Sequence, residues 1–347
     1  MLKEKLKENK ETLIKLLPFI SFITPFLILY LVQDVTFRYS FEATWKGRAF
    51  YIFFIWFAVL EMIVSWEKLQ PKAFKRPKYV RTIALILALS LPTIYVVVSN
   101  FYGLNEAIYE WSKSNRIAGA GWAHSFMPLS IEYLAFATFF FLIIFLQYGI
   151  DGFRRMLLAP TFLATMGIIY MIDNLYPYGR FAPLQIPATV TAIVASSFLN
   201  LVGYQTSIAY IKCKMFPQLG WAPDILYNSD YVFTVAWPCS GVESLIIYTL
   251  FMLIFLRDLD ISRTRKIIYF VIGAIITYFI NIGRIIALFM IAINYGSGSE
   301  LFTRFHEYYG QLISISWIAV YPLLIIVGGN ILQKIKFFIK FLKKRLL

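Results

Sequence analysis

The chain contains 347 residues, of which 59% are hydrophobic and only 15% are charged, with a formal net charge of +14. A soluble protein of this length would be closer to half apolar, and several long runs carry almost no charge, as transmembrane helices do. Two cysteines without a Cys-x-x-Cys motif argue against a disulfide framework or a zinc site, and two histidines leave little material for a metal centre. The composition therefore predicts an all-α, polytopic helix bundle in a membrane, and no cofactor is expected.

The positive charge is concentrated in five short segments between the apolar runs. These segments hold 23 of the 33 lysines and arginines and comprise residues 1–15, 66–81, 149–155, 257–266 and 332–347. Cytoplasmic loops of membrane proteins carry such an excess of basic residues, so we expect all five segments to lie in the cytoplasm. Their charge would orient the helices and contact anionic lipid, and no nucleic-acid partner is expected.

Eight apolar segments are predicted to cross the membrane as helices. In chain order they cover residues 16–33, 49–65, 82–101, 127–149, 156–172, 241–256, 267–294 and 311–332, approximately. The first segment is preceded by basic residues, but no small-residue cleavage site follows it. This indicates an uncleaved helix rather than a signal peptide. The polar connections are predicted to be loops, at residues 102–126, 211–238 and 295–310.

The segment from Pro187 to Tyr210 is ambiguous, because it is apolar but carries several threonine, serine and asparagine residues. If residues 149–155 and 257–266 are both cytoplasmic, an even number of spans must separate them. We therefore expect residues 187–210 to lie at the outer interface or to be re-entrant. The alternative is that this segment spans the membrane and places the following loop in the cytoplasm. The preferred topology has eight full spans and both termini in the cytoplasm.

One stretch combines a cysteine with a predicted helix start, from Trp237 to Ser244. Ser240 is predicted to be the N-cap, and Glu243, three residues later, would complete a capping box. Cys239 would then lie just outside the first turn, where free N–H groups and the helix dipole favour an anion. Such a position suits a nucleophilic thiolate, although cysteines in apolar proteins are more often inert small hydrophobes.

Arg284 lies within an apolar span, where an arginine is costly and usually faces the bundle interior or a water-filled cavity. Asn281 precedes it by three residues and shares its helix face. The structural alternative is an arginine that snorkels to the surface or pairs with Glu61 or Glu132. The functional interpretation is a guanidinium that stabilises an oxyanion or binds a substrate carboxylate.

His306 stands in the loop before the last predicted span. Alone it would be a polar surface residue, but beside a cysteine it could act as a general base and later as a general acid. The preferred topology places Cys239 and His306 at the outer face, with Arg284 roughly 15 Å below the outer end of its helix. The three groups would thus meet in one leaflet.

Three motifs in this order resemble the signature of the exosortase/archaeosortase family. They are Pro238-Cys239-Ser240-Gly241-Val242-Glu243-Ser244, Asn281-Ile282-Gly283-Arg284 and His306-Glu307-Tyr308-Tyr309-Gly310. The resemblance covers residues 237–310 and implies that 156–347 form the catalytic transmembrane region. Residues 1–155 would be N-terminal transmembrane helices without an assigned role.

The resemblance implies a membrane cysteine transpeptidase or protease. Cys239 would form a thioester with the substrate, Arg284 would stabilise the tetrahedral oxyanion, and His306 would transfer protons. Arg304 is a rival for the third role, since some family members use arginine there. The supporting residues would be Ser240, Gly241, Glu243 and Asn281.

The resemblance also implies the partners and the location. Substrates would be surface proteins with a C-terminal motif, a transmembrane helix and a basic tail. They would be cleaved on the extracytoplasmic side of the plasma (inner) membrane and passed to an acceptor, for which a lipid is one candidate. A buried catalyst would exclude water while the thioester waits for an amine.

Two other functions compete with the transpeptidase interpretation. A transporter would use Glu61, Glu132 and Arg284 as a polar path, but the helix pattern contains no inverted repeat. Both acids lie near predicted span edges and are expected to face water or to pair with a base. A plain intramembrane cysteine protease would use the same residues and release a free carboxylate. Cys213 and His124 are predicted to have no catalytic role.

Overall fold

The computed structural model describes residues 2–31, 45–72, 79–115, 126–175, 182–212, 221–228, 231–257, 259–310 and 312–328. Internal contacts divide the chain into two compact units. The first comprises Met1–Gln185 with Ile211–Ala222, and the second comprises Ile186–Tyr210 with Pro223–Leu347. His124 and Cys213 lie outside the described residues.

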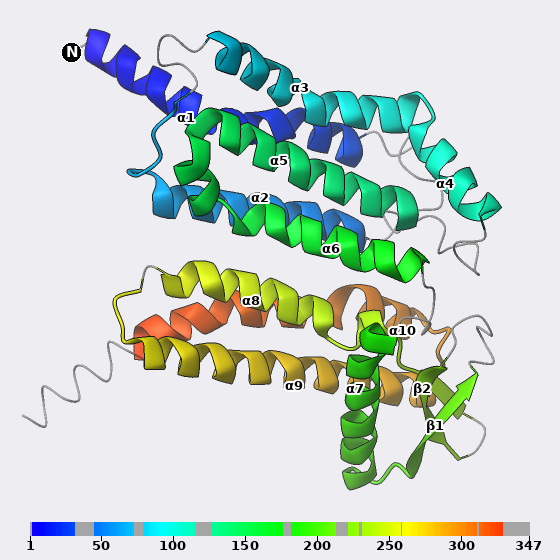
Figure 1. Ribbon diagram of the computed structural model, residues 1–347. Helices are drawn as coiled ribbons and strands as arrows, with labels where there is room; N and C mark the ends of the chain where they lie inside the picture. Colours follow the sequence, from blue (N-terminus) through cyan, green and yellow to red (C-terminus); the bar gives the residue numbers. More distant parts are fainter. Residues whose placement is uncertain are drawn as a thin grey trace, which may run out of the picture. The chain divides into compact units, whose positions relative to one another are not determined.

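The first unit is a bundle of helices. Its elements are α1 (Leu2–Leu31), α2 (Trp45–Ser65), α3 (Tyr79–Phe101), α4 (Leu104–Ser114), α5 (Phe126–Arg155) and α6 (Leu158–Leu175). The five long helices run alongside one another, and the short α4 follows the end of α3 (Figure 1). Their core is built from aromatic side chains: Phe22 of α1 contacts Phe54 of α2 and Phe136 of α5 edge to face. Such aromatic pairs add directional attraction to the burial of apolar surface.

Two buried carboxylates in the first unit bind protein groups. Glu61 is 0% exposed, and its two oxygens accept hydrogen bonds from the backbone N–H groups of Leu158 and Ala159, each at 3.0 Å. It therefore caps the N-terminus of α6, where N–H groups lack intrahelical partners and a negative charge is favoured. Glu132 is also 0% exposed and accepts a hydrogen bond from the Tyr51 hydroxyl. Neither acid faces water, so that half of the expectation is wrong. That the acids pair with a base stays a prediction.

The second unit contains the remaining helices and most of a small sheet, while the first residues of α7, the end of β1 and the start of β2 are assigned to the first unit. Its elements are α7 (Ala182–Leu201), β1 (Thr206–Lys212), β2 (Trp221–Tyr227), β3 (Tyr231–Thr234), the 3₁₀ helix η3 (Trp237–Cys239), α8 (Val242–Arg257), α9 (Arg263–Tyr295), α10 (Glu300–Arg304), the π-helix η4 (Phe305–Tyr309) and a helix at Leu312–Gly328. Helices α8 and α9 pack side by side, whereas α7 runs across their direction (Figure 1).

The sheet has the strand order β1-β2-β3, and β2 pairs with β3 antiparallel, with Asp224 opposite Thr234. Asp224 is 2% exposed, and this burial raises the pKa of its carboxyl group, partly offset by a hydrogen bond with Thr234. Ile225 on the other face of β2 joins a core of α7 alanines and α9 isoleucines. The sheet thus attaches the chain before Cys239 to α7 and α9.

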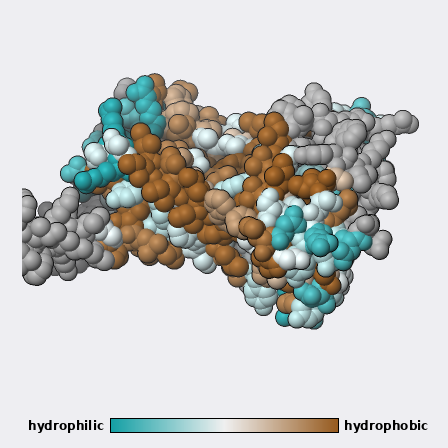
Figure 2. Space-filling model, turned by 90° about the horizontal axis from the view of Figure 1, so that it is seen from below, coloured by the Kyte–Doolittle hydropathy of each residue, from teal (hydrophilic) through white to brown (hydrophobic). Residues whose placement is uncertain are grey.

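Four helices of the described residues are long and apolar enough to cross a membrane: Glu11–Leu31, Tyr79–Phe101, Met127–Arg155 and Arg263–Tyr295. Large apolar side chains remain exposed along α9 from Ile267 to Phe279. Figure 2 shows extensive hydrophobic surface on the side where α7 and α9 lie, with hydrophilic patches toward the ends. Exposed apolar surface of this extent requires an apolar environment.

The structure confirms a helix in each of the eight predicted spans and an all-α bundle as the dominant architecture. The ambiguous segment 187–210 forms most of α7 and the start of β1, and α7 lies crosswise to α8 and α9 (Figure 1). The three predicted loops contain short elements, namely α4, the β-strands, and α10 with η4. In addition, α6 packs against α2 and α5 of the first unit. The division by role into residues 1–155 and 156–347 stays a prediction.

Replacing Glu61 with alanine would remove two charge-assisted hydrogen bonds from the start of α6. We expect Glu61→Ala to lower the free energy of unfolding by about 3 kcal/mol, because the two N–H groups would remain buried without their acceptor. Thermal unfolding in detergent measures this loss. The control is Glu106→Ala, an exposed acid in the first turn of α4, which should lose at most about 1 kcal/mol because its charge is exposed to solvent. Equal stability of Glu61→Ala and wild type would contradict the capping role.

Candidate active site

Cys239 lies on a tight turn between the sheet and α8, which we name the Cys239 turn (residues 237–242). The turn starts with η3, in which the backbone N–H groups of Cys239 and Ser240 donate to Ala236 O at 2.9 Å and Trp237 O at 3.0 Å. Gly241 follows with a φ of +89°, and α8 begins at Val242. The Cys239 side chain is half-buried and packs against the core shared by α7 and α9.

The capping box predicted from Ser240 and Glu243 differs from the observed arrangement. The Ser240 hydroxyl donates to Trp237 O at 2.5 Å, so it closes the 3₁₀ turn, and the residue before α8 is Gly241. A serine hydroxyl can bind a nearby carbonyl as readily as a helix N–H group. Glu243 is buried in the first turn of α8, where a carboxylate is favoured by the helix dipole.

Asn281 fastens the Cys239 turn to α9. This side chain is fully buried, and its Nδ2 donates to Cys239 O at 3.0 Å. The contact needs the glycine at 241, since a Cβ there would lie 2.9 Å from Asn281 Cγ, closer than side chains pack. A positive φ also favours glycine at this position. The Cys-Ser-Gly and Asn-x-x-Arg motifs therefore pack directly against each other, through Gly241 and Asn281.

Arg284 fastens the segment of His306 to the same helix. The arginine is 5% exposed, and its Nη2 donates to the backbone oxygen of His306 at 3.2 Å. Gly310 makes room for it, because a Cβ at 310 would lie 2.7 Å from Arg284 Nε. This burial rules out an arginine that snorkels to the surface. The spacing from His306 to Gly310 thus has a packing explanation.

His306 lies in the π-helix η4 and faces the cysteine. Its Nε2 is 4.0 Å from Cys239 Sγ, and its ring stacks on Phe302 with an interplanar angle of 5°. Single turns of π-helix occur often at functional sites, since they turn a side chain away from the regular helical direction. At this distance a small approach would bring the thiol within proton-transfer range of the imidazole.

Arg304, the rival for the third role, is placed differently. Its side chain is 63% exposed, and Nη2 lies 2.5 Å from a carboxylate oxygen of Glu300, one turn earlier on α10. The structure therefore brings Cys239 of η3, Arg284 of α9 and His306 of η4 together, and it places Arg304 in an exposed ion pair. Of the two candidates for the third role, only His306 has a contact with the cysteine among the described residues.

Three residues of this site were missed by the sequence analysis. Gly310 was included in a motif, but its packing against Arg284 could not be inferred without the structure. Thr191 donates to Ser240 O at 3.0 Å, and its hydroxyl lies 3.1 Å from that of Tyr278. Tyr278 precedes Asn281 by three residues, so a search for polar side chains at helical spacing from Asn281 would have found it.

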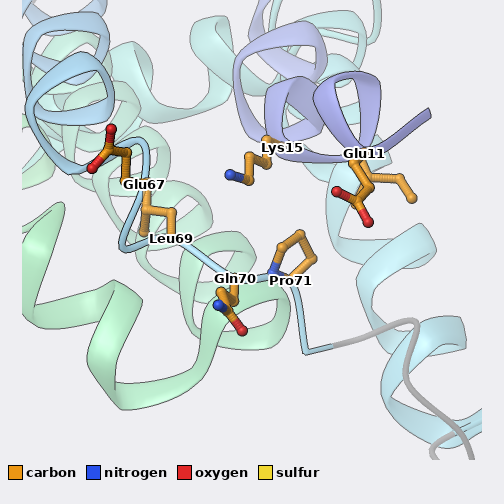
Figure 3. A pocket seen from close by; sticks show the side chains of 7 residues that line it. Glu11, Lys15, Glu67, Leu69, Gln70 and Pro71 are labelled. Atoms are coloured by element: carbon orange, nitrogen blue, oxygen red, sulfur yellow. The ribbon is translucent and has the colours of Figure 1, made fainter. Parts of the chain in front are cut away.

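A separate cavity lies within the first unit. Its volume is about 360 Å³, and Figure 3 shows it between α1 and the segment after α2, lined by Glu11, Ile14, Lys15, Glu67, Leu69, Gln70 and Pro71. The Lys15 ammonium donates to Trp66 O at 2.9 Å and lies 4.7 Å from the centre of the indole ring. None of the predicted catalytic residues lines this cavity.

The fold and the site define a class of polytopic membrane protein in which a cysteine, a histidine and a buried arginine meet beside a helix start. Residues 19–323 match the family described as transmembrane exosortase (Exosortase_EpsH). Because the match covers most of the chain, the protein belongs to the transmembrane exosortase family and is a multi-pass membrane protein. The resemblance predicted from the three motifs is confirmed. No curated protein and no solved structure matches the chain.

The close fit of Gly241 against Asn281 predicts the effect of adding one methyl group. We expect Gly241→Ala to lower the rate at which iodoacetamide alkylates Cys239 by about tenfold, since the added Cβ must displace the turn and costs on the order of 1–3 kcal/mol. Mass spectrometry of the labelled peptide measures the rate. Gly283→Ala is the matched control, because a Cβ at 283 meets no atom within 4 Å. Equal alkylation rates in the two variants would contradict this account of the turn.

Proposed function

We propose that this exosortase is a membrane-embedded cysteine transpeptidase that cleaves a C-terminal sorting signal and transfers the protein to an acceptor through a thioester. The observation that carries the proposal is the 4.0 Å separation of Cys239 Sγ and His306 Nε2, beside a buried Arg284 that binds the His306 backbone. Acyl transfer through a cysteine uses a thiol, a base that accepts its proton and a fixed hydrogen-bond donor for the oxyanion, and Arg284 can supply the third.

The proposed reaction proceeds in two halves. His306 accepts the thiol proton, and the Cys239 sulfur attacks the scissile carbonyl carbon to give a tetrahedral oxyanion beside the Arg284 guanidinium. The C–N bond then breaks, and His306 returns the proton to the leaving amine. In the second half an acceptor amine attacks the thioester, His306 takes its proton, and the Cys239 sulfur leaves. Attack by water instead of an amine would give hydrolysis.

The proposed substrates enter as transmembrane helices. They are surface proteins whose C-terminal region carries a short motif, an apolar helix and a basic tail, and the acceptor is lipid-related. We propose that both termini are cytoplasmic in the plasma (inner) membrane and that the Cys239 turn faces the outer side. The crosswise orientation of α7 relative to α8 and α9 supports a segment that lies along the interface rather than across it (Figure 1).

The bonds of the intramembrane acids give no support to a transporter. Glu61 caps α6 through two backbone N–H groups, and Glu132 accepts from the Tyr51 hydroxyl. An acid that carries a proton or an ion would have to release its hydrogen-bond partners in each transport cycle. Release by Glu61 would leave the N-terminus of α6 without its cap. The acids therefore fit a structural role in the helix bundle.

The proposal predicts a strict requirement for the Cys239 sulfur. We expect Cys239→Ala and Cys239→Ser to abolish processing, so that precursors retaining their C-terminal helix and basic tail accumulate in the membrane. Quantitative proteomics of C-terminal peptides from membranes of the host measures this, with Cys213→Ala as the control that should process normally. Normal processing in folded Cys239→Ala would refute the proposed function.

A further inference from the structure

Helix α7 contacts the Cys239 turn through a buried hydroxyl, next to the apolar core against which Cys239 packs. Thr191 is 0% exposed and donates to Ser240 O at 3.0 Å. The neighbouring contacts of α7 are apolar and small: Ala188, Ala192 and Ala195 are fully buried in the core that also contains Ile282 and Ile285 of α9. A polar group in such surroundings is costly unless it is hydrogen-bonded, and the bond it makes goes to the residue after the cysteine.

The direction of the hydrogen bonds follows from the number of available protons. A threonine hydroxyl has one proton, and the Thr191 proton is directed to Ser240 O. The Tyr278 hydroxyl, 3.1 Å away, therefore donates its own proton to Thr191 Oγ1. Tyr278, Thr191 and Ser240 thus form a chain of bonds with one orientation, and bonds in such a chain strengthen one another in a low-dielectric interior.

The two peptide groups that follow Cys239 are each held by a different helix. Asn281 of α9 binds Cys239 O at 3.0 Å, and Thr191 of α7 binds Ser240 O at 3.0 Å. A trans peptide places its N–H group opposite its carbonyl, so the Thr191 bond also sets the direction of the Gly241 N–H group. The turn has a positive φ at Gly241, and a turn of this kind can change its shape when one carbonyl is released.

We infer that Thr191, supported by Tyr278, is a positioning residue that keeps the Cys239 turn in the shape that directs Cys239 toward His306. The inference rests on the proposed function, because it assigns Thr191 a role in the reactivity of Cys239. The geometry assigns the role to the hydroxyl and not to the bulk of the side chain. A valine at 191 would keep the volume and lose the bond, whereas a serine would keep the bond and lose one methyl group.

The experiment compares Thr191→Val and Thr191→Ser in the full-length Cys213→Ala protein in detergent. Iodoacetamide alkylation of Cys239 at neutral pH is followed by mass spectrometry, and thermal unfolding of each variant is measured in parallel. We expect Thr191→Val to lower the alkylation rate about fivefold, as loss of one buried hydrogen bond implies, and Thr191→Ser to restore most of it. Tyr278→Phe should lower the rate about twofold, since the Thr191 bond remains.

Thr277→Val is the matched control. Thr277 is as buried as Thr191 and accepts a hydrogen bond from Trp317 Nε1 at 3.1 Å, but it makes no contact with the turn among the described residues. We expect this variant to alkylate like the wild type even where its unfolding temperature falls. If Thr191→Val does not fold, the comparison of Thr191→Ser and Tyr278→Phe with Thr277→Val takes its place.

Three results would overturn the inference: wild-type alkylation in Thr191→Val, an equal loss in Thr191→Val and Thr191→Ser, or an equal loss in Thr277→Val. The proposed function fails separately, through normal processing in Cys239→Ala. A cysteine that is essential for processing, combined with full reactivity in Thr191→Val, would therefore reject the positioning role alone.

Discussion

Two hydrogen bonds from one face of α9 position the Cys239 turn and the segment that carries His306. Asn281 binds the backbone oxygen of Cys239, and Arg284, three residues later, binds the backbone oxygen of His306. Residues at this spacing share a helix face, so one helix, α9, sets the distance between the Cys239 thiol and the His306 imidazole. The cysteine and the histidine are 67 residues apart in sequence, and neither α8 nor η4 could fix that separation alone.

The two glycines of the motifs are consequences of the same constraint. A Cβ at Gly241 would meet Asn281, and a Cβ at Gly310 would meet Arg284. Each glycine allows a backbone segment to lie directly against a polar side chain of α9 without an intervening layer. The spacing of the motifs therefore reflects close packing of the backbone at the two glycines against the side chains of Asn281 and Arg284. This packing positions Cys239 and His306.

A structural hydrogen bond and a proposed catalytic role together explain why an apolar span contains Arg284. It is buried and bonded to the backbone of His306, so it stabilises the site before any substrate arrives. A guanidinium has five donors, and in the proposed reaction the same group would stabilise the developing oxyanion. A lysine could not bind the carbonyl and an oxyanion with the same fixed geometry.

The helices and the meeting of the three motifs could be predicted from the sequence, because long apolar runs and polar residues within them are strong signals. The sheet, α4 and α10 could not, since short elements contain too few residues to show a period. The capping box was predicted from Ser240 and Glu243, but the Ser240 hydroxyl binds Trp237 O, a competing local partner. Thr191 is one of several polar residues in the ambiguous segment 187–210, and nothing in the sequence distinguishes it from the others as a contact of the Cys239 turn.

Glu61 shows a second reason why the sequence could not predict the contacts: its partners are backbone groups. Glu61 was correctly recognised as an unusual intramembrane residue, but its partners are backbone N–H groups nearly one hundred residues away. Every residue except proline carries such a group, so no sequence pattern identifies which helix start an acid will cap. The same applies to Asn281 and Arg284, whose acceptors are backbone carbonyls.

The central claim is that His306 activates Cys239. The most direct test is the rate of Cys239 alkylation by iodoacetamide at neutral pH in the Cys213→Ala protein, with and without His306→Ala. His124→Ala serves as the control. The account predicts at least a tenfold loss of rate in folded His306→Ala, since general-base assistance typically contributes about 10²–10⁴-fold, and no loss in His124→Ala. An unchanged rate in His306→Ala would contradict the assignment of Cys239 and His306 as a reacting pair.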